Sequence, residues 1–173
     1  MRKIVFVLLA VAAVAGVVVS MTPASGHANE GATPVFVTRI PAGYRDWRLI
    51  SVAHEAGNLN SFSAVLGNDV AIKAYREGKL PFPDGTIIAA LHYRFVASEE
   101  NDKVFGRRQS FVPGAPTNVQ FMVKDSKKYA ATGGWGFGHF QDGKPVTGAS
   151  MQTCFPCHQL TKATDLVFTH YAP

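Results

Sequence analysis

Both cysteines of this 173-residue chain lie in one short stretch near its C-terminal end, Cys154-Phe155-Pro156-Cys157-His158. Two neighbouring cysteines cannot form a framework of disulfides between distant segments, so the fold must depend on other interactions. Hydrophobic residues make up 47% of the chain and charged residues only 17%, which excludes an intrinsically disordered protein. The length fits one domain with a processing segment.

The spacing of the two cysteines and the histidine that follows them is typical of a covalent c-type haem site. Each thiol would add to one vinyl group of the porphyrin, and His158 would ligate the iron. A thioredoxin-like dithiol normally lies early in a chain, near a β-α-β unit, and a zinc site needs further ligands at close spacing. We therefore expect one haem c, attached covalently at Cys154 and Cys157, with His158 as the metal ligand.

The N-terminal segment has the layout of a secretory signal peptide. Met1-Arg2-Lys3 is a short basic head, residues 4–19 are an almost unbroken apolar run, and Gly26-His27-Ala28 supplies small residues before a cleavage site. The alternative is an uncleaved anchor, although a bilayer span typically needs about 20 apolar residues. We expect a signal peptide over residues 1–28 and one exported, periplasmic domain over residues 29–173.

The charge pattern argues against nucleic acid as a partner. The formal net charge is +5, and the expected signal peptide contains two of the basic residues, Arg2 and Lys3. No run of basic residues is interleaved with aromatic side chains. We expect no nucleic-acid partner and, after signal cleavage, no membrane contact.

Most of the remaining chain has strand patterns. Residues 86–97 form the longest expected strand, with an apolar odd-numbered face and an even-numbered face that turns polar. A short strand is expected over residues 35–40, and a helix is expected with Asn68 or Asp69 as its N-terminal cap and Gly78 as its stop. The expected fold class is mainly β, an antiparallel β-sheet with a few helices packing around one haem c.

Residues 133–140 alternate glycine with large side chains. A strand of this kind has one bare face, which either a neighbouring part of the protein or a flat ligand can approach closely. The sequence leaves both possibilities open.

The second axial position of the iron is not settled by the sequence. An apolar cap would leave the iron open to a small molecule, whereas a methionine or histidine ligand would suit electron transfer. Methionine is a common core residue, and a lone histidine is usually an ordinary surface or core residue. The candidate ligands are Met122, Met151, His54, His92, His139 and His170.

Small c-type cytochromes are usually helical and carry the haem motif early, whereas here it ends a β-rich chain. This combination resembles the cytochrome P460 family, together with its relative cytochrome c′-beta. The resemblance covers roughly residues 44–173, and the most family-specific features are Pro83-Asp84-Gly85-Thr86 and Gly133-Gly134-Trp135-Gly136 together with the late haem motif. The resembling stretches as a whole are residues 66–71, 74–76, 81–89, 133–137, 154–158 and 167–173.

The resemblance implies a mainly antiparallel β-sheet, a homodimer, and a haem with His158 as proximal ligand and an open or weakly occupied opposite face. Members of one branch oxidise hydroxylamine, alone or with nitric oxide, and carry a lysine cross-linked to the porphyrin. Members of the other branch lack this cross-link, have an apolar cap and bind nitric oxide or carbon monoxide.

The sequence departs from the first branch at the expected cross-link. In ungapped register, the position of the lysine is occupied by Ala90, two residues before His92. Residues 60–65, where the resemblance places an arginine or carboxylate, offer neither and include Phe62. We expect Phe62, Ala90 and His92 to line the open face of the haem, with Phe82 as a further candidate.

Three functions stay open at this point. The first is a gas-binding protein with a five-coordinate iron, and an apolar pocket favours it. The second is a hydroxylamine or nitric oxide oxidoreductase in which another residue replaces the lysine, and the third is a plain electron-transfer cytochrome with His92 or Met122 as sixth ligand. The expected partners are a small molecule (nitric oxide, carbon monoxide or hydroxylamine) and a redox partner protein.

Overall fold

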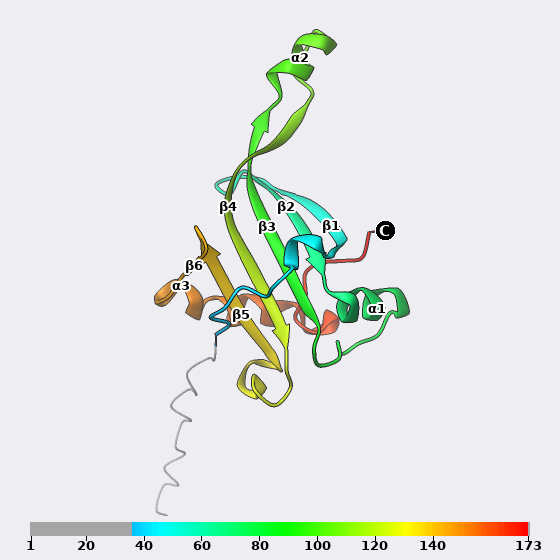
Figure 1. Cartoon of the computed structure of the whole chain (residues 1–173), viewed down its shortest axis with the longest axis vertical. Helices are drawn as coiled ribbons and strands as arrows, with labels where there is room; N and C mark the ends of the chain where they lie inside the picture. The colour runs from blue at the N-terminus through cyan, green and yellow to red at the C-terminus, as the bar shows by residue number, and fades with distance from the viewer. Residues whose placement is uncertain (1–35, 173) are drawn as a thin grey trace, which may run out of the picture. The chain divides into compact units, whose positions relative to one another are not determined.

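Six antiparallel strands form one sheet in chain order in the computed structural model, which describes residues 36–172 (Figure 1). The strands are β1 (Arg48–Glu55), β2 (Ser61–Gly67), β3 (Ile87–Ala97), β4 (Phe111–Lys124), β5 (Trp135–Gln141) and β6 (Lys144–Pro145). The helices are α1 (Asp69–Glu77), α2 (Glu99–Phe105), α3 (Ala149–Gln152) and α4 (Cys154–His158), with 3-10 turns η1 (Tyr44–Asp46), η2 (Ala130–Thr132) and η3 (Gln159–Thr164). The mainly β fold with few helices is confirmed.

The expected signal peptide, residues 1–28, lies outside the described residues, so its boundary with the domain stays a prediction. Within residues 36–172, no helix combines the length and apolar character that a membrane crossing requires.

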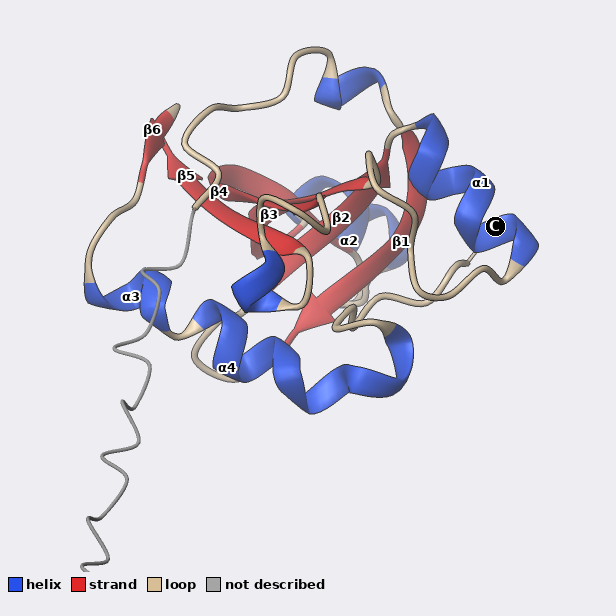
Figure 2. Cartoon of the chain, turned by 90° about the horizontal axis from the view of Figure 1, so that it is seen from below, coloured by secondary structure: helices blue, strands red, loops and turns tan. Residues whose placement is uncertain are grey.

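The odd-numbered and even-numbered residues of β3 pack into two different hydrophobic clusters, one on each face of the sheet. Its buried odd-numbered residues Ala89 and Leu91 pack with Phe121 of β4 and Phe140 of β5. Its even-numbered face contributes to a second cluster, which α1, α4 and the C-terminal segment share. Figure 2 shows α3 and α4 along one side of the sheet.

The predicted helix is α1. The side chain of Asn68 caps it by accepting a hydrogen bond from the backbone N–H of Ala71, and Gly78 ends it in the left-handed conformation. The same Asn68 oxygen accepts from the N–H of Ile87, and its amide donates to Gly85, so the cap also ties α1 to the start of β3.

The prediction of a strand over residues 35–40 is wrong for its described part. Residues 36–40 contain no strand, although the N–H of Val37 donates one hydrogen bond of 2.9 Å to the carbonyl of Phe137. A single bond makes no ladder, and the hydrophobic pattern of the segment comes from its packing over the sheet.

The bare glycine face of β5 is covered by the chain itself. A Cβ atom at Gly136 would lie 2.2 Å from the ring of Tyr129, and one at Gly138 would lie 3.0 Å from Val37. The glycines therefore admit neighbouring parts of the protein. The opposite face of β5 carries Phe137 and His139.

Candidate functional site

A cavity of about 760 Å³ lies between the even-numbered face of the sheet and the C-terminal segment. Its volume falls within the range of roughly 300–1,000 Å³ that is typical of cofactor and ligand sites. Strands β1 to β5 form one wall, and α3, α4 and residues 167–170 supply the rest.

The haem motif forms one wall of this cavity. Cys154, Cys157 and His158 all line it and lie on the single helix α4. Residues three and four positions apart share a helix face, so the two thiols and the imidazole face the same space. Neither cysteine is in a disulfide, and burial raises the pKa of the Cys154 thiol.

His158 is oriented for metal binding. Its Nδ1 lies 2.7 Å from the carbonyl oxygen of Leu166, which can only accept, so Nδ1 carries the proton and Nε2 keeps a free lone pair. The rings of Phe137 and Phe168 pack on it at centroid distances of 4.9 and 5.1 Å. Burial, opposed by the hydrogen bond to Leu166, lowers the pKa of His158 and favours the neutral imidazole that a metal requires.

The chain's residues therefore fit a haem c. Two unpaired thiols and a neutral, hydrogen-bonded imidazole lie on one wall of a cavity of suitable size. A metal-ligating histidine normally donates its second N–H to a protein acceptor in this way, because the bond fixes its tautomer and orientation. Cys154 and Cys157 would hold the porphyrin, and His158 would ligate its iron.

Ala90 and His92 also line the cavity, as expected from their shared strand face. Phe62, in contrast, does not, and this expectation must be corrected. Ser63 and Val65 of β2 line the cavity, so strand alternation places Phe62 on the other face. There its ring packs against those of His54 and Phe95.

Phe82 is likewise placed elsewhere. It is buried against Trp135 and Tyr75, with ring centroids 5.8 and 4.9 Å away, and it lines a separate hollow beside α1. The aromatic side chains that border the main cavity include Phe137 and Phe168, which the sequence analysis did not select.

Some of the candidate ligands for the second axial position line the cavity, and others lie elsewhere. Met122, His92, His139 and His170 line the cavity, whereas His54 and Met151 do not. Nε2 of His92 is buried without a hydrogen-bond partner in the described part of the chain. Burial lowers the pKa of His92; the charge of Glu55 raises this pKa, and His139 lowers it. The pKa of His139 is lowered by burial alone.

Glu55 is a cavity residue that the sequence analysis missed. It ends β1, opposite Ser61 of β2 in the sheet, and contributes the single carboxylate among the described residues of the cavity wall. The alternation of residues along β1 could have indicated that Glu55 shares a face with Ser51 and Ala53. Only the pairing of β1 with β2 brings that face to the cavity. Among residues 36–172, no lysine and no arginine lines this cavity.

One comparison with known proteins identifies a family. The family model described as Cytochrome P460 matches residues 41–169, which include β1 to β5 and the whole of α4. A comparison with curated proteins finds no match.

Proposed function

The chain belongs to the cytochrome P460 family of haem c proteins, and we propose that it binds nitric oxide or another small diatomic ligand at an open haem face. One haem is attached through thioether bonds at Cys154 and Cys157, and His158 is its proximal ligand. The bound haem supplies the iron at which the small molecule coordinates. The protein's own residues hold the porphyrin, orient the imidazole and set the polarity of the cavity.

The observation that carries this proposal is the place of Ala90. It lies on the cavity wall between Ile88 and His92, at the position where the family resemblance puts a cross-linking lysine. A methyl group can neither bond to a porphyrin nor ligate iron. On one side of Ala90 the wall is apolar, with Val65, Ile88 and Phe137, whereas Gln120 and His92 are its polar neighbours. The apolar part favours neutral diatomic ligands over charged or strongly hydrated ones.

A second candidate, the hydroxylamine or nitric oxide oxidoreductase, draws support from the polar end of the cavity. Glu55, His92 and His139 line the same space. Oxidation of hydroxylamine releases protons as well as electrons, and a carboxylate or neutral imidazole can accept a proton. The plain electron-transfer cytochrome draws support from Met122 and His92, either of which would supply a sixth ligand.

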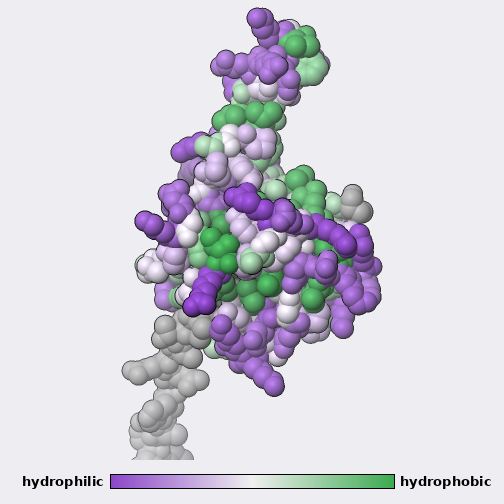
Figure 3. All heavy atoms as spheres, viewed as in Figure 1, coloured by the Kyte–Doolittle hydropathy of each residue, from purple (hydrophilic) through white to green (hydrophobic). Residues whose placement is uncertain are grey.

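We propose further that residues 1–28 direct the protein to the periplasm, where it exchanges electrons with a redox partner protein. A homodimer is also proposed. The β3–β4 hairpin carries α2 away from the rest of the sheet, and Figure 3 shows hydrophobic surface along this extension. Its exposed apolar side chains are Val96, Val104, Phe105 and Phe111. Pairing with a second copy would cover them.

The ferrous optical spectrum of the exported protein, made with haem-attachment machinery and recorded with and without nitric oxide, separates the three functions. A high-spin spectrum that changes with nitric oxide supports gas binding. The red-shifted band of cross-linked family members would favour the oxidoreductase and contradict the role of Ala90. A low-spin spectrum indifferent to nitric oxide would leave the electron carrier.

A further inference from the structure

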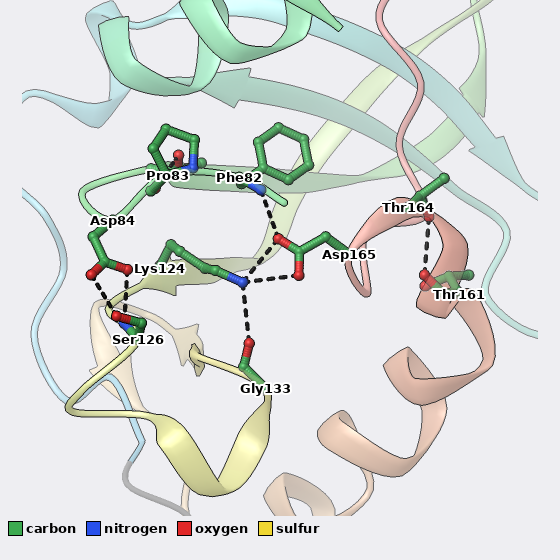
Figure 4. A network of polar contacts seen from close by, with 10 residues as sticks. Phe82, Pro83, Asp84, Lys124, Ser126, Gly133, Thr161, Thr164 and Asp165 are labelled. Atoms are coloured by element: carbon green, nitrogen blue, oxygen red, sulfur yellow. Dashed lines mark hydrogen bonds and ion pairs between the residues drawn. The ribbon is translucent and has the colours of Figure 1, made fainter. Parts of the chain in front are cut away.

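Lys124, the last residue of β4, forms a buried ion pair with Asp165, which follows η3 (Figure 4). Its Nζ lies 2.9 Å from each carboxylate oxygen and 3.1 Å from the carbonyl oxygen of Gly133. The two side chains are 7% and 14% exposed, and the ammonium group also lies 4.9 Å from the ring centroid of Trp135. The three N–H donors of Lys124 thus have three acceptors within reach.

The carboxylate of Asp165 holds a second segment. One of its oxygens accepts a hydrogen bond of 2.8 Å from the backbone N–H of Phe82. The segment that contains Phe82 is itself tied to the chain beyond β4, because Asp84 accepts from the N–H and the hydroxyl of Ser126 (Figure 4). Asp165 is therefore anchored to the end of the sheet both directly and through this segment.

The backbone at Asp165 and Leu166 has an unusual conformation. Their φ angles are +52° and +67°, in the left-handed region that non-glycine residues rarely adopt. Such backbone is energetically costly and persists only where surrounding interactions hold it. Local bonds contribute, since Thr164 donates to the carbonyl of Val167, but the ion pair with Lys124 links the turn to the sheet.

This turn presents the acceptor for the proximal histidine. The carbonyl of Leu166, directly after Asp165, accepts the Nδ1–H of His158 at 2.7 Å. The direction of that carbonyl depends on the backbone angles of the same two residues. The contacts thus run from Lys124 through Asp165 and Leu166 to the imidazole.

The energetics of buried ion pairs favour a role beyond stability. Removing two charges from water is costly, so a well-packed apolar pair is often at least as stabilising. The ammonium group of Lys124 does, however, bond to Gly133 and Asp165 at once, so it fixes the position of the Asp165 carboxylate relative to the end of the sheet. Nothing in the proposed function itself uses Lys124.

We infer that Lys124 and Asp165 are positioning residues for the iron ligand: their ion pair holds the Asp165–Leu166 turn so that the Leu166 carbonyl keeps its hydrogen bond to His158. The inference rests on the proposed function in one respect, that His158 ligates the iron. A hydrogen bond from Nδ1–H raises the basicity of a ligating imidazole and fixes its ring. Loss of the ion pair should weaken the bond between iron and histidine and raise the reduction potential of the haem.

The test uses the exported, haem-loaded protein and the variant Lys124→Met, which removes the charge and keeps an unbranched chain. The readouts are the iron–histidine stretching band of the ferrous protein by resonance Raman spectroscopy and the reduction potential. We expect a lower band frequency and a higher potential, with partial recovery in Lys124→Arg. The matched control is Lys73→Met, which removes the same charge from the exposed Lys73–Glu77 pair on α1 and should leave both values unchanged.

The outcomes are distinguishable. A Lys124→Met protein that is less stable but keeps the wild-type band and potential would overturn the inference and leave a structural role. Should this variant fail to fold, Asp165→Asn, which keeps the side-chain shape, is expected to give the same two shifts, and wild-type values there would likewise overturn it. An absent iron–histidine band in the ferrous wild-type protein would instead contradict the proposed function, because that band requires a five-coordinate iron with a histidine ligand.

Discussion

The Nδ1–H of His158 donates a hydrogen bond to the backbone oxygen of Leu166, with 2.7 Å between the two atoms. The bond joins the last residue of α4 to a turn beyond η3 and leaves Nε2 as the free nitrogen of the ring. The haem motif therefore contains a histidine whose tautomer is already the one that iron binding requires.

Replacing His158 with alanine should abolish normal axial ligation, because no other residue of α4 carries a metal-binding nitrogen. The optical spectrum of the haem-loaded variant measures this loss. His54→Ala is the control, since His54 lies outside the cavity and stacks on Phe95 at 4.0 Å. A His158→Ala spectrum equal to that of the wild type would show that the proximal ligand is a different residue.

Each of the variants Cys154→Ser and Cys157→Ser should retain the haem through one thioether bond, and the double variant should retain none. Serine cannot form a thioether with a vinyl group, although it keeps the size of the side chain. Mass spectrometry of the unfolded protein measures the covalently held haem. Haem mass on the unfolded double variant would mean that another residue forms the covalent link.

Ala90→Lys should lower the affinity for nitric oxide by about tenfold or more, equivalent to roughly 1.4 kcal/mol. The long side chain would extend from the cavity wall into the space of the small ligand, and its amine offers either an iron ligand or a porphyrin cross-link. Optical titration with nitric oxide is the measurement. Ala90→Val, which adds volume without an amine, should change the affinity less, and equal affinities in all three proteins would argue against the assigned role of Ala90.

Stability should fall as the pH drops below about 6.5, the ordinary pKa of histidine. Burial lowers the folded-state pKa of His92 and His139, so below the unfolded value the unfolded chain binds more protons than the folded one. Above that value the difference disappears. At His92, Glu55 raises the pKa and so reduces this loss of stability, whereas His139 lowers the pKa and so increases it.

Urea unfolding at pH 5.5 and 7.5 measures this loss. His92→Gln, which keeps a polar side chain but cannot titrate, should lose less stability between the two pH values than the wild type does. An identical pH dependence in the two proteins would exclude His92 as a source of the effect.

Gly136→Ala should destabilise the fold by about 1–3 kcal/mol, the usual cost of overpacking. The new Cβ would lie 2.2 Å from the ring of Tyr129, which is buried. Urea unfolding is again the measurement. Combined with Tyr129→Leu, the alanine should cost less than it does alone, because the two side chains share one space. Strictly additive effects would mean that the ring does not restrict this position.

The parts that sequence reasoning predicted correctly depend on local spacing. Strand alternation separates the even-numbered residues of β3 from their odd-numbered neighbours. Asn68 and Gly78 mark the ends of α1 because capping chemistry is decided within a few residues. The family resemblance was likewise carried by short stretches of the chain.

What the tertiary structure alone decided is which distant residues share a space. Phe62 and Ser63 are neighbours, yet the face of β2 that meets the cavity follows from its register with β1 and β3, and that register placed Phe62 outside. Glu55 reaches the cavity for the same reason. Lys124 and Asp165 are 41 residues apart, and only the folded sheet brings them within 2.9 Å. Such pairings depend on long-range packing, which no local periodicity encodes.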